Sequence, residues 1–127
     1  MKKFIKIVTD ILLVIVLVMA AVIYIPRLMG LKTYKVLSGS MEPEYHVGSV
    51  VYVEKSLIDD IEVGDVITFY INDNTVVTHR VVDKDDDTES FRTKGDANEI
   101  EDGGSVAYDK VVGKVVLNVP YLGYILR

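Results

Sequence analysis

Residues 66–82 read VITFYINDNTVVTHRVV, two runs of β-branched and aromatic residues on either side of a short polar stretch. Side chains of these types favour the pleated backbone of a strand. Asn72-Asp73-Asn74 lies between the runs. Asparagine and aspartate are common in tight turns because their side chains bond to the nearby backbone. The stretch therefore predicts a β-hairpin with strands at 66–70 and 76–82.

Similar short runs lie on both sides of this hairpin. Further strands are expected at Val50 to Val53, Ser90 to Thr93 and Val111 to Val119. Polar loops are expected at 83–87 and 102–104, and residues 33–127 contain no long helical periodicity and no internal repeat. The body of the chain is thus predicted to be a small antiparallel β domain of about 90 residues, which is enough for one hydrophobic core.

The first thirty residues have a different character. The range 2–6 holds three lysines and precedes an uninterrupted apolar run from Ile11 to Ile25. A bilayer-spanning helix needs about 20 predominantly apolar residues, a length that Phe4 to Ile25 supplies. We therefore predict a mainly β protein with an N-terminal transmembrane helix, in which residues 1–30 form a membrane anchor and residues 31–127 form the β domain.

A cleaved signal peptide is the alternative for this segment, because a basic start and an apolar core fit that pattern as well. No A-x-A pattern closes the run, since bulky Ile23-Tyr24-Ile25 follows Ala20 and Ala21. An anchor is therefore favoured. The lysines at the amino terminus place that end on the cytoplasmic side by the positive-inside rule, and the β domain on the extracytoplasmic side.

Charge is distributed unevenly along the chain. Residues 1–32 carry five Lys/Arg and one Asp, whereas residues 33–127 carry nine Lys/Arg and eighteen Asp/Glu. An acidic β domain is repelled by phosphates, so nucleic acid is not an expected partner. A basic end followed by an acidic body agrees instead with an orientation across a membrane.

Neither a metal nor another cofactor is predicted. The chain has no cysteine, which excludes a disulfide framework, a thiol nucleophile and cysteine-ligated metal sites. Asp83, Asp85 and Asp87 match the first ligand positions of a calcium-binding EF-hand loop. Thr88 stands where that loop needs glycine, and Lys94 where it needs a bidentate glutamate. A solvated hairpin loop is therefore the interpretation of this acidic run.

Three segments carry residues that are unusual in a plain β domain: Ser38–Pro43, Thr78–Arg80 with a histidine inside an apolar strand, and Lys94–Asp102 with an aspartate near each end. A serine hydroxyl becomes a useful nucleophile when a base takes its proton and a third group orients that base. Taken singly, each segment also has a purely structural explanation, as a turn, a core histidine or a capped loop. Spacing alone does not decide between these readings.

The order of the motifs supplies a further argument. An apolar anchor is followed by S-G-S-M-E-P at 38–43, T-H-R-V at 78–81, and K-G-D-A-N at 94–98 with a second aspartate at Asp102. This order resembles the type I signal peptidases, from the anchor to about Tyr124. It is most similar to their endoplasmic-reticulum-like branch, found in eukaryotes, archaea and some Gram-positive bacteria, which has histidine where the bacterial branch has lysine. The resemblance implies a β domain of the signal peptidase/LexA type.

The resemblance also implies roles for individual residues. Ser40 is the nucleophile, His79 is the general base and then the general acid, and Asp102 orients His79. Asp96 is implied as a supporting residue, either in contact with His79 or shaping the loop. The Ser38 hydroxyl and the Ser40 backbone N–H resemble an oxyanion hole.

The implied activity is that of a membrane-bound serine endopeptidase with histidine as its base. It cleaves N-terminal signal peptides from exported preproteins after small residues at positions −1 and −3. Val36, Leu37 and Met41 adjoin Ser40 and are expected to contact the substrate, although a core role explains them equally well. The expected partners are preproteins, the lipid bilayer and other subunits of a processing complex.

Two departures and two alternatives accompany this resemblance. Ala97 occupies a position that is often asparagine in the family, and many relatives continue into a second membrane segment. A self-cleaving protease of the LexA type has the same fold but uses lysine as its base and lacks an anchor. A non-catalytic membrane-tethered β module that binds an exported partner is the alternative from a different functional class.

Overall fold

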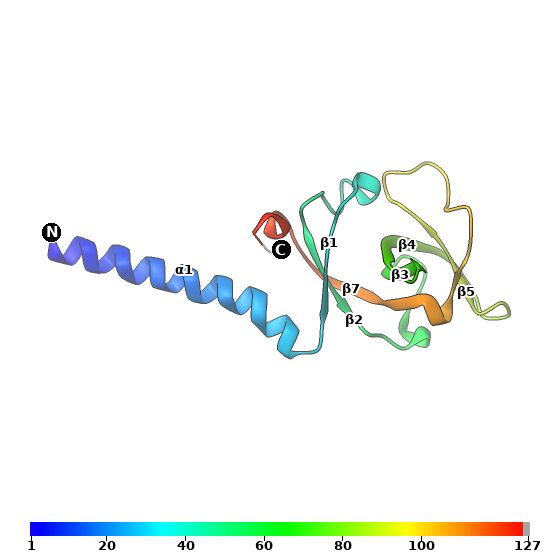
Figure 1. The fold of residues 1–127 in the computed structure, drawn as a ribbon, viewed down its shortest axis with the longest axis horizontal. Helices are drawn as coiled ribbons and strands as arrows, with labels where there is room; N and C mark the ends of the chain where they lie inside the picture. The colour runs from blue at the N-terminus through cyan, green and yellow to red at the C-terminus, as the bar shows by residue number, and fades with distance from the viewer. Residues whose placement is uncertain (126–127) are drawn as a thin grey trace. The chain divides into compact units, whose positions relative to one another are not determined.

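The computed structural model describes residues 1–125 and divides the chain into two compact units, Met1–Leu31 and Lys32–Arg127 (Figure 1). The first unit is one helix with the turn that ends it. The second unit contains all of the strands and has its own hydrophobic core.

The first unit is helix α1, Lys2–Leu28. Its side chains are exposed almost throughout, and it is long and apolar enough to cross a membrane. Lys6 and Asp10, one turn apart near the start, form an exposed ion pair of 2.8 Å. Gly30, two residues after the helix ends, has a positive φ of 84°, which suits the turn after a helix because glycine has no Cβ. The predicted apolar helix is confirmed.

The second unit is one seven-stranded antiparallel sheet in the order β1-β2-β7-β3-β4-β5-β6 (Figure 1). Its strands are β1 (Lys32–Lys35), β2 (Val50–Glu54), β3 (Val66–Asn72), β4 (Thr75–Asp85), β5 (Ser90–Lys94), β6 (Val106–Ala107) and β7 (Val111–Val119). Three short 3-10 helices lie between strands, η1 (Gly39–Met41), η2 (Ile58–Asp60) and η3 (Tyr108–Lys110), and a fourth, η4 (Leu122–Tyr124), follows β7 within the described residues. The predicted mainly β class is therefore confirmed.

The predicted hairpin is present as β3 and β4. The side chain of Asn72 accepts a hydrogen bond of 2.9 Å from the backbone N–H of Asn74, which is the local turn bond expected of asparagine. The predicted loop at 83–87 is partly wrong, because β4 continues to Asp85. Asp83 lies opposite Arg92 on β5, and the two form an exposed ion pair of 3.5 Å, so acidic residues are accommodated within the strand.

The hydrophobic core is formed by side chains from β3, β4, β5 and β6 and from the residue that follows η2. Its buried members are Ile61, Ile67, Phe69, Val81, Phe91 and Val106. Alternate residues of a strand point to opposite faces, which places Ile67 and Phe69 on the core side together. A second set of buried side chains runs along β2, from Val50 to Val53. These buried strands hold β4 and the end of β5 in fixed positions for the polar residues described next.

Candidate active site

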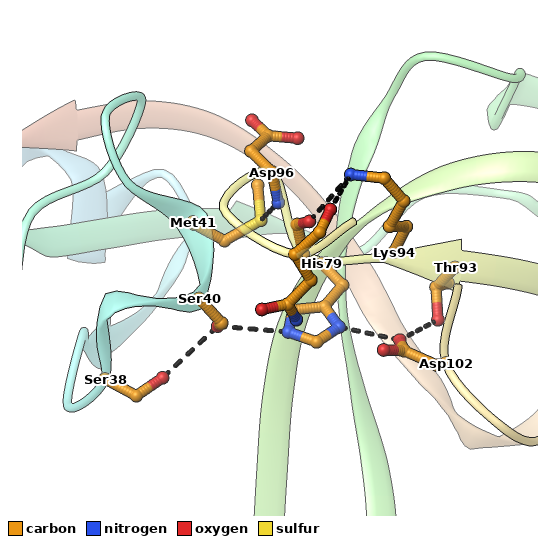
Figure 2. Close-up of polar contacts among 10 residues, drawn as sticks. Ser38, Ser40, Met41, His79, Thr93, Lys94, Asp96 and Asp102 are labelled. Carbon is orange, nitrogen blue, oxygen red and sulfur yellow. Dashed lines mark hydrogen bonds and ion pairs between the residues drawn. The ribbon is translucent and has the colours of Figure 1, made fainter. Parts of the chain in front are cut away.

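Ser40, His79 and Asp102 come from three separate segments, and their side chains meet in a line (Figure 2). The Ser40 Oγ lies 3.0 Å from His79 Nε2, and His79 Nδ1 lies 2.6 Å from Asp102 Oδ2. A carboxylate only accepts hydrogen bonds, so Nδ1 carries the ring proton and Nε2 is free to accept one from the serine hydroxyl. The arrangement can therefore move a proton from Ser40 to His79.

The segment after β1 presents the serines. Ser40 lies in η1, and the backbone N–H of Val36 bonds to Ser49 at 2.9 Å, which anchors the start of this segment beside β2. The carbonyl of Ser40 accepts a hydrogen bond of 2.9 Å from the N–H of Ala97. Ser38 Oγ lies 3.2 Å from Ser40 Oγ, so a second hydroxyl faces the same point in space. Ala97 thus acts through its backbone, whatever its side chain.

Strand β4 carries His79 in the sheet. The residue is 8% exposed, and its ring meets Phe69 edge-on with 6.5 Å between ring centroids. In the register of the hairpin, His79 lies opposite Ile67. A buried imidazole between apolar neighbours and one carboxylate has little freedom to rotate, which keeps Nε2 aimed at Ser40.

Asp102 lies at the end of the loop that follows β5. Its backbone N–H donates to the carbonyl of Thr93 at 2.9 Å, so the loop returns to the strand from which it left. The Thr93 hydroxyl donates to Asp102 Oδ2 at 2.6 Å. The same oxygen therefore receives bonds from Thr93 and from His79, which fixes the carboxylate in position (Figure 2).

Asp96 has a different neighbour. Its two carboxylate oxygens accept hydrogen bonds of 2.8 and 2.7 Å from Arg80, the residue after His79. Arg80 also donates to the carbonyl of Gly64 at 2.7 Å. Hydrogen bonding to Arg80 lowers the pKa of Asp96, and the same bonds raise the pKa of Arg80. Within residues 1–125 the structure gives the Asp96 side chain no hydrogen bond to His79. Asp96 instead ties its loop to Arg80 of strand β4.

Gly95 lies beside the Ser40 backbone and the His79 ring. A Cβ at this position would lie 2.6 Å from the Ser40 carbonyl oxygen and 3.1 Å from His79 Nε2. The first distance is far below van der Waals contact with a backbone atom. Only glycine leaves room for the loop, the serine backbone and the imidazole together.

A pocket of about 310 Å³ adjoins Ser40. Val36, Leu37 and Met41 all line it, together with Ser38, Ser40 and His79. Met41 is buried, whereas Leu37 is 81% exposed. The pocket lies between residues 34–38, at and just after the end of β1, and residues 76–79 of β4. In the described part of the chain, β1 pairs only with β2, and this half of β4 pairs only with β3. An extended peptide fits between such edges.

Sequence reasoning missed three contributors to this site. Thr93 fixes Asp102, Gly95 leaves space for the reacting groups, and Arg80 holds Asp96. Gly95 and Arg80 belong to the K-G-D and T-H-R motifs, so the sequence marked these positions but did not show what they do. No motif marked Thr93, because threonine is common in strands for its β-branched shape alone.

Among the residues that the structure describes, no cluster of three or more His, Cys, Asp or Glu side chains could hold a metal ion.

Comparison with known proteins gives consistent results. A family model described as "Signal peptidase, peptidase S26" matches residues 8–100. The chain is 44% identical over 89 residues to signal peptidase I W of Bacillus subtilis, which covers 68% of this chain and 47% of that protein. It is 35% identical over 101 residues to the signal peptidase complex catalytic subunit SEC11 of Fusarium vanettenii, with 71% and 59% covered. It is 34% identical over 101 residues to human SEC11C, the corresponding subunit, with 71% and 53% covered.

The chain therefore spans about half the length of the curated relatives it matches. The matched residues 8–100 include Ser40 and His79 and stop just before Asp102. This match covers well over half of the chain. The chain belongs to the signal peptidase family, peptidase S26.

Proposed function

We propose that this chain is a membrane-bound serine endopeptidase that removes signal peptides from exported preproteins. The observation that carries the proposal is the unbroken series of hydrogen bonds from Ser40 through His79 to Asp102, beside a pocket open to an extended chain. Family membership supports the same conclusion.

In the proposed mechanism Ser40 attacks the carbonyl carbon at the cleavage site while its proton moves to His79 Nε2. The positive imidazolium is stabilised by Asp102, 2.6 Å away. When the tetrahedral intermediate collapses, His79 gives this proton to the leaving amine and the acyl group stays on Ser40. Water, activated by His79, then hydrolyses the ester and restores the serine.

Ser38 is proposed to serve the oxyanion. Its hydroxyl lies 3.2 Å from Ser40 Oγ, close to where the carbonyl oxygen of a bound substrate gains negative charge. The Ser40 N–H is the proposed second donor. Each such donor typically contributes about 3 kcal/mol to transition-state stabilisation.

The signal peptide is proposed to bind as an extended strand in the pocket beside Ser40. Alternate side chains of a strand point to the same face, so the residues at −1 and −3 both face the pocket. Val36, Leu37 and Met41 line a volume of about 310 Å³, which accommodates small side chains at these positions. The preference for small residues at −1 and −3 is what membership of the signal peptidase family implies, and this pocket is the proposed place where the two side chains bind.

Helix α1 is proposed to anchor the enzyme, with residues 1–30 in the membrane and residues 31–127 as the extracytoplasmic catalytic domain. The lysines near the start of α1 favour a cytoplasmic amino terminus. Confinement of enzyme and preprotein to one membrane raises their effective concentration, so weak intrinsic affinity is sufficient.

Other subunits of a processing complex are proposed partners, alongside preproteins and the bilayer. Two of the similar proteins are described as catalytic subunits of a signal peptidase complex.

The test is cleavage of a preprotein by the detergent-solubilised full chain. Wild type is compared with Ser40→Ala, His79→Ala and the control Ser56→Ala, a serine whose hydroxyl bonds only to the nearby Glu54 carbonyl in the described structure. We expect cleavage by wild type and the control and none by the two site variants. Equal cleavage by all four proteins would refute the assigned roles. A folded wild type that binds preproteins without cutting them would favour the tethered binding module.

A further inference from the structure

A second cavity, of about 540 Å³, is lined by His79 but not by Ser38 or Ser40. His79 and Val77 line both cavities, whereas Asp102 and Thr93 line only this one. Figure 2 shows the corresponding order of side chains, from Ser38 and Ser40 through His79 to Asp102 and Thr93. The two cavities therefore flank the histidine from the serine side and the aspartate side.

The chemistry of peptide cleavage separates the two ends of a substrate at this point. The acyl part stays bound to Ser40, next to Ser38 and the smaller pocket. The leaving amine must reach His79 Nε2, because that atom donates the proton it needs. The chain beyond the amine then continues past the imidazole, away from Ser38 and toward the Asp102 side.

We propose that the cavity beside Asp102 binds the first residues of the released chain, those that follow the cleavage site. This inference rests on the proposed function, since it assigns a place to the other half of the same substrate.

The walls of the cavity suit an extended peptide. Ile71, Val77 and Val106 supply apolar surface, and Ile71 is 59% exposed. Strand β6, whose two residues line the cavity, is the last strand of the sheet and pairs with β5 alone in the described part of the chain. Its free edge can form backbone hydrogen bonds with a bound chain in the manner of an added strand.

The positive charge of Lys110 affects which substrate side chains the cavity favours. Lys110 is exposed and lines the cavity, and the structure gives it no ion pair among residues 1–125. The Asp102 carboxylate oxygen that faces His79 already accepts two hydrogen bonds. Asp102 keeps its negative charge, so the preference belongs to Lys110 alone: an acidic side chain that reaches Lys110 after the cut is favoured there over a basic one.

The loop after Asp102 offers a matched pair of variants. A Cβ at Gly103 or Gly104 would meet nothing within 4 Å, so either position accepts a larger side chain without a clash. Gly104 lines the cavity and Gly103 does not. Gly104→Trp fills the cavity, and Gly103→Trp adds the same bulk to the same loop outside it.

Two substrates separate this inference from the proposed function. They share one acyl-side sequence, and one continues for several residues after the cut whereas the other ends there as an N-methylamide. We expect Gly104→Trp to lower kcat/KM for the long substrate about tenfold and to leave the N-methylamide unchanged. Gly103→Trp is expected to change neither. Thermal unfolding followed by circular dichroism checks that each variant is folded.

A charge reversal supplies the second arm. Wild type is expected to prefer acidic over basic residues just after the cut by about two- to fivefold, as for an exposed ion pair. Lys110→Glu is expected to reverse this preference, and Lys55→Glu, at an exposed lysine away from the cavity, is expected to keep it.

The outcomes are distinguishable. Wild-type cleavage of neither substrate would refute the proposed function and with it this inference. Cleavage of both substrates by a folded Gly104→Trp at wild-type rates would refute the inference alone. An equal loss on both substrates, with an unchanged charge preference in Lys110→Glu, would also refute it.

Discussion

The imidazole of His79 is confined from two directions. Asp102 fixes Nδ1 through a bond of 2.6 Å, and the backbone of Gly95 passes close to Nε2. Neither neighbour reacts in the proposed mechanism, yet each sets where Nε2 lies relative to Ser40. Placement of a reacting atom to within about 1 Å affects rate strongly, so these contacts matter as much as the identity of the base.

Gly95→Ala tests this confinement. The added Cβ would lie 2.6 Å from the Ser40 carbonyl oxygen, so the loop or the serine backbone must move. We expect kcat/KM for preprotein cleavage to fall about 10²-fold. The control Gly103→Ala, whose Cβ meets open space, should retain wild-type activity. Wild-type activity in a folded Gly95→Ala would contradict the packing described here.

The pH dependence of cleavage tests the base. An imidazole accepts a proton only when it is neutral, and histidine side chains in general gain their charge between about pH 8 and pH 5. We expect kcat/KM to fall as the pH is lowered through this range, with the folded fraction checked by circular dichroism at each pH. A flat profile for a chain that stays folded would count against histidine as the base.

At the residue scale, the sequence indicated which side chains are candidates for the site but not how they lie relative to one another. Ser40, His79 and Asp102 were selected through resemblance to a family, because no spacing rule brings three distant segments together. The bond from Thr93 to Asp102 and the space at Gly95 depend on how the loop returns to β5. Such contacts arise only in three dimensions and have no local pattern.

Strand β4 connects the two halves of the site. Its first half pairs with β3 and carries His79, and its second half pairs with β5, whose end leads into the loop of Asp96 and Asp102. Arg80 lies at the change of partner and binds Asp96 with two hydrogen bonds. Strand β4 therefore positions the base, His79, and through Arg80 it also positions the loop that carries Asp96.

Asp96→Asn tests this connection. Because bonding to Arg80 lowers the pKa of Asp96 from 3.8, the folded chain binds a proton there less readily than the unfolded chain. The ion pair thus stabilises the fold above about pH 4, and this contribution disappears as the pH falls through the lowered pKa. We expect Tm to drop by about 2–4 °C at pH 7 and the difference from wild type to shrink below about pH 4.

The control for this measurement is Asp59→Asn, at an exposed aspartate of η2. It should leave Tm unchanged at both pH values. A Tm difference for Asp96→Asn that stayed constant down to pH 3 would show that the carboxylate charge is not what stabilises the loop.

Elements with strong patterns were predictable, and weak ones were not. The hairpin of β3 and β4, along with β2, β5 and β7, follow from β-branched runs between turns. Strand β1, Lys-Thr-Tyr-Lys, was missed because edge strands tolerate lysine, and β6 was missed because it has only two residues. Their positions are determined by pairing with β2 and β5.

At the scale of the whole molecule, helix α1 and the β unit differ in composition and in burial. The helix is predominantly apolar and is exposed along most of its length, whereas the β unit has its own core and the candidate site. The apolar helix and the mainly β class of the remainder were predictable because the change from an apolar run to alternating strands is abrupt. In the proposed function the helix supplies membrane attachment and the β unit supplies chemistry.

Replacement of Val14 and Val18 by arginine tests this division. Each arginine near the middle of a spanning helix costs about 2.5–3.5 kcal/mol of insertion free energy. We expect alkaline carbonate to extract the variant from membranes that retain wild type. Leu57→Arg with Val63→Arg, at exposed positions of the β unit, is the control and should stay bound. Equal retention of both variants would contradict a spanning role for α1.

The central claim is that Ser40, His79 and Asp102 act as one unit in cleaving a preprotein. The most direct test compares kcat/KM for Ser40→Ala, His79→Ala and the double variant. Residues that act together in one step lose their contribution together, so we predict losses on the order of 10⁴-fold or more for each single variant and no further loss in the double variant. Losses that multiply in the double variant, or cleavage retained by Ser40→Ala, would contradict the account.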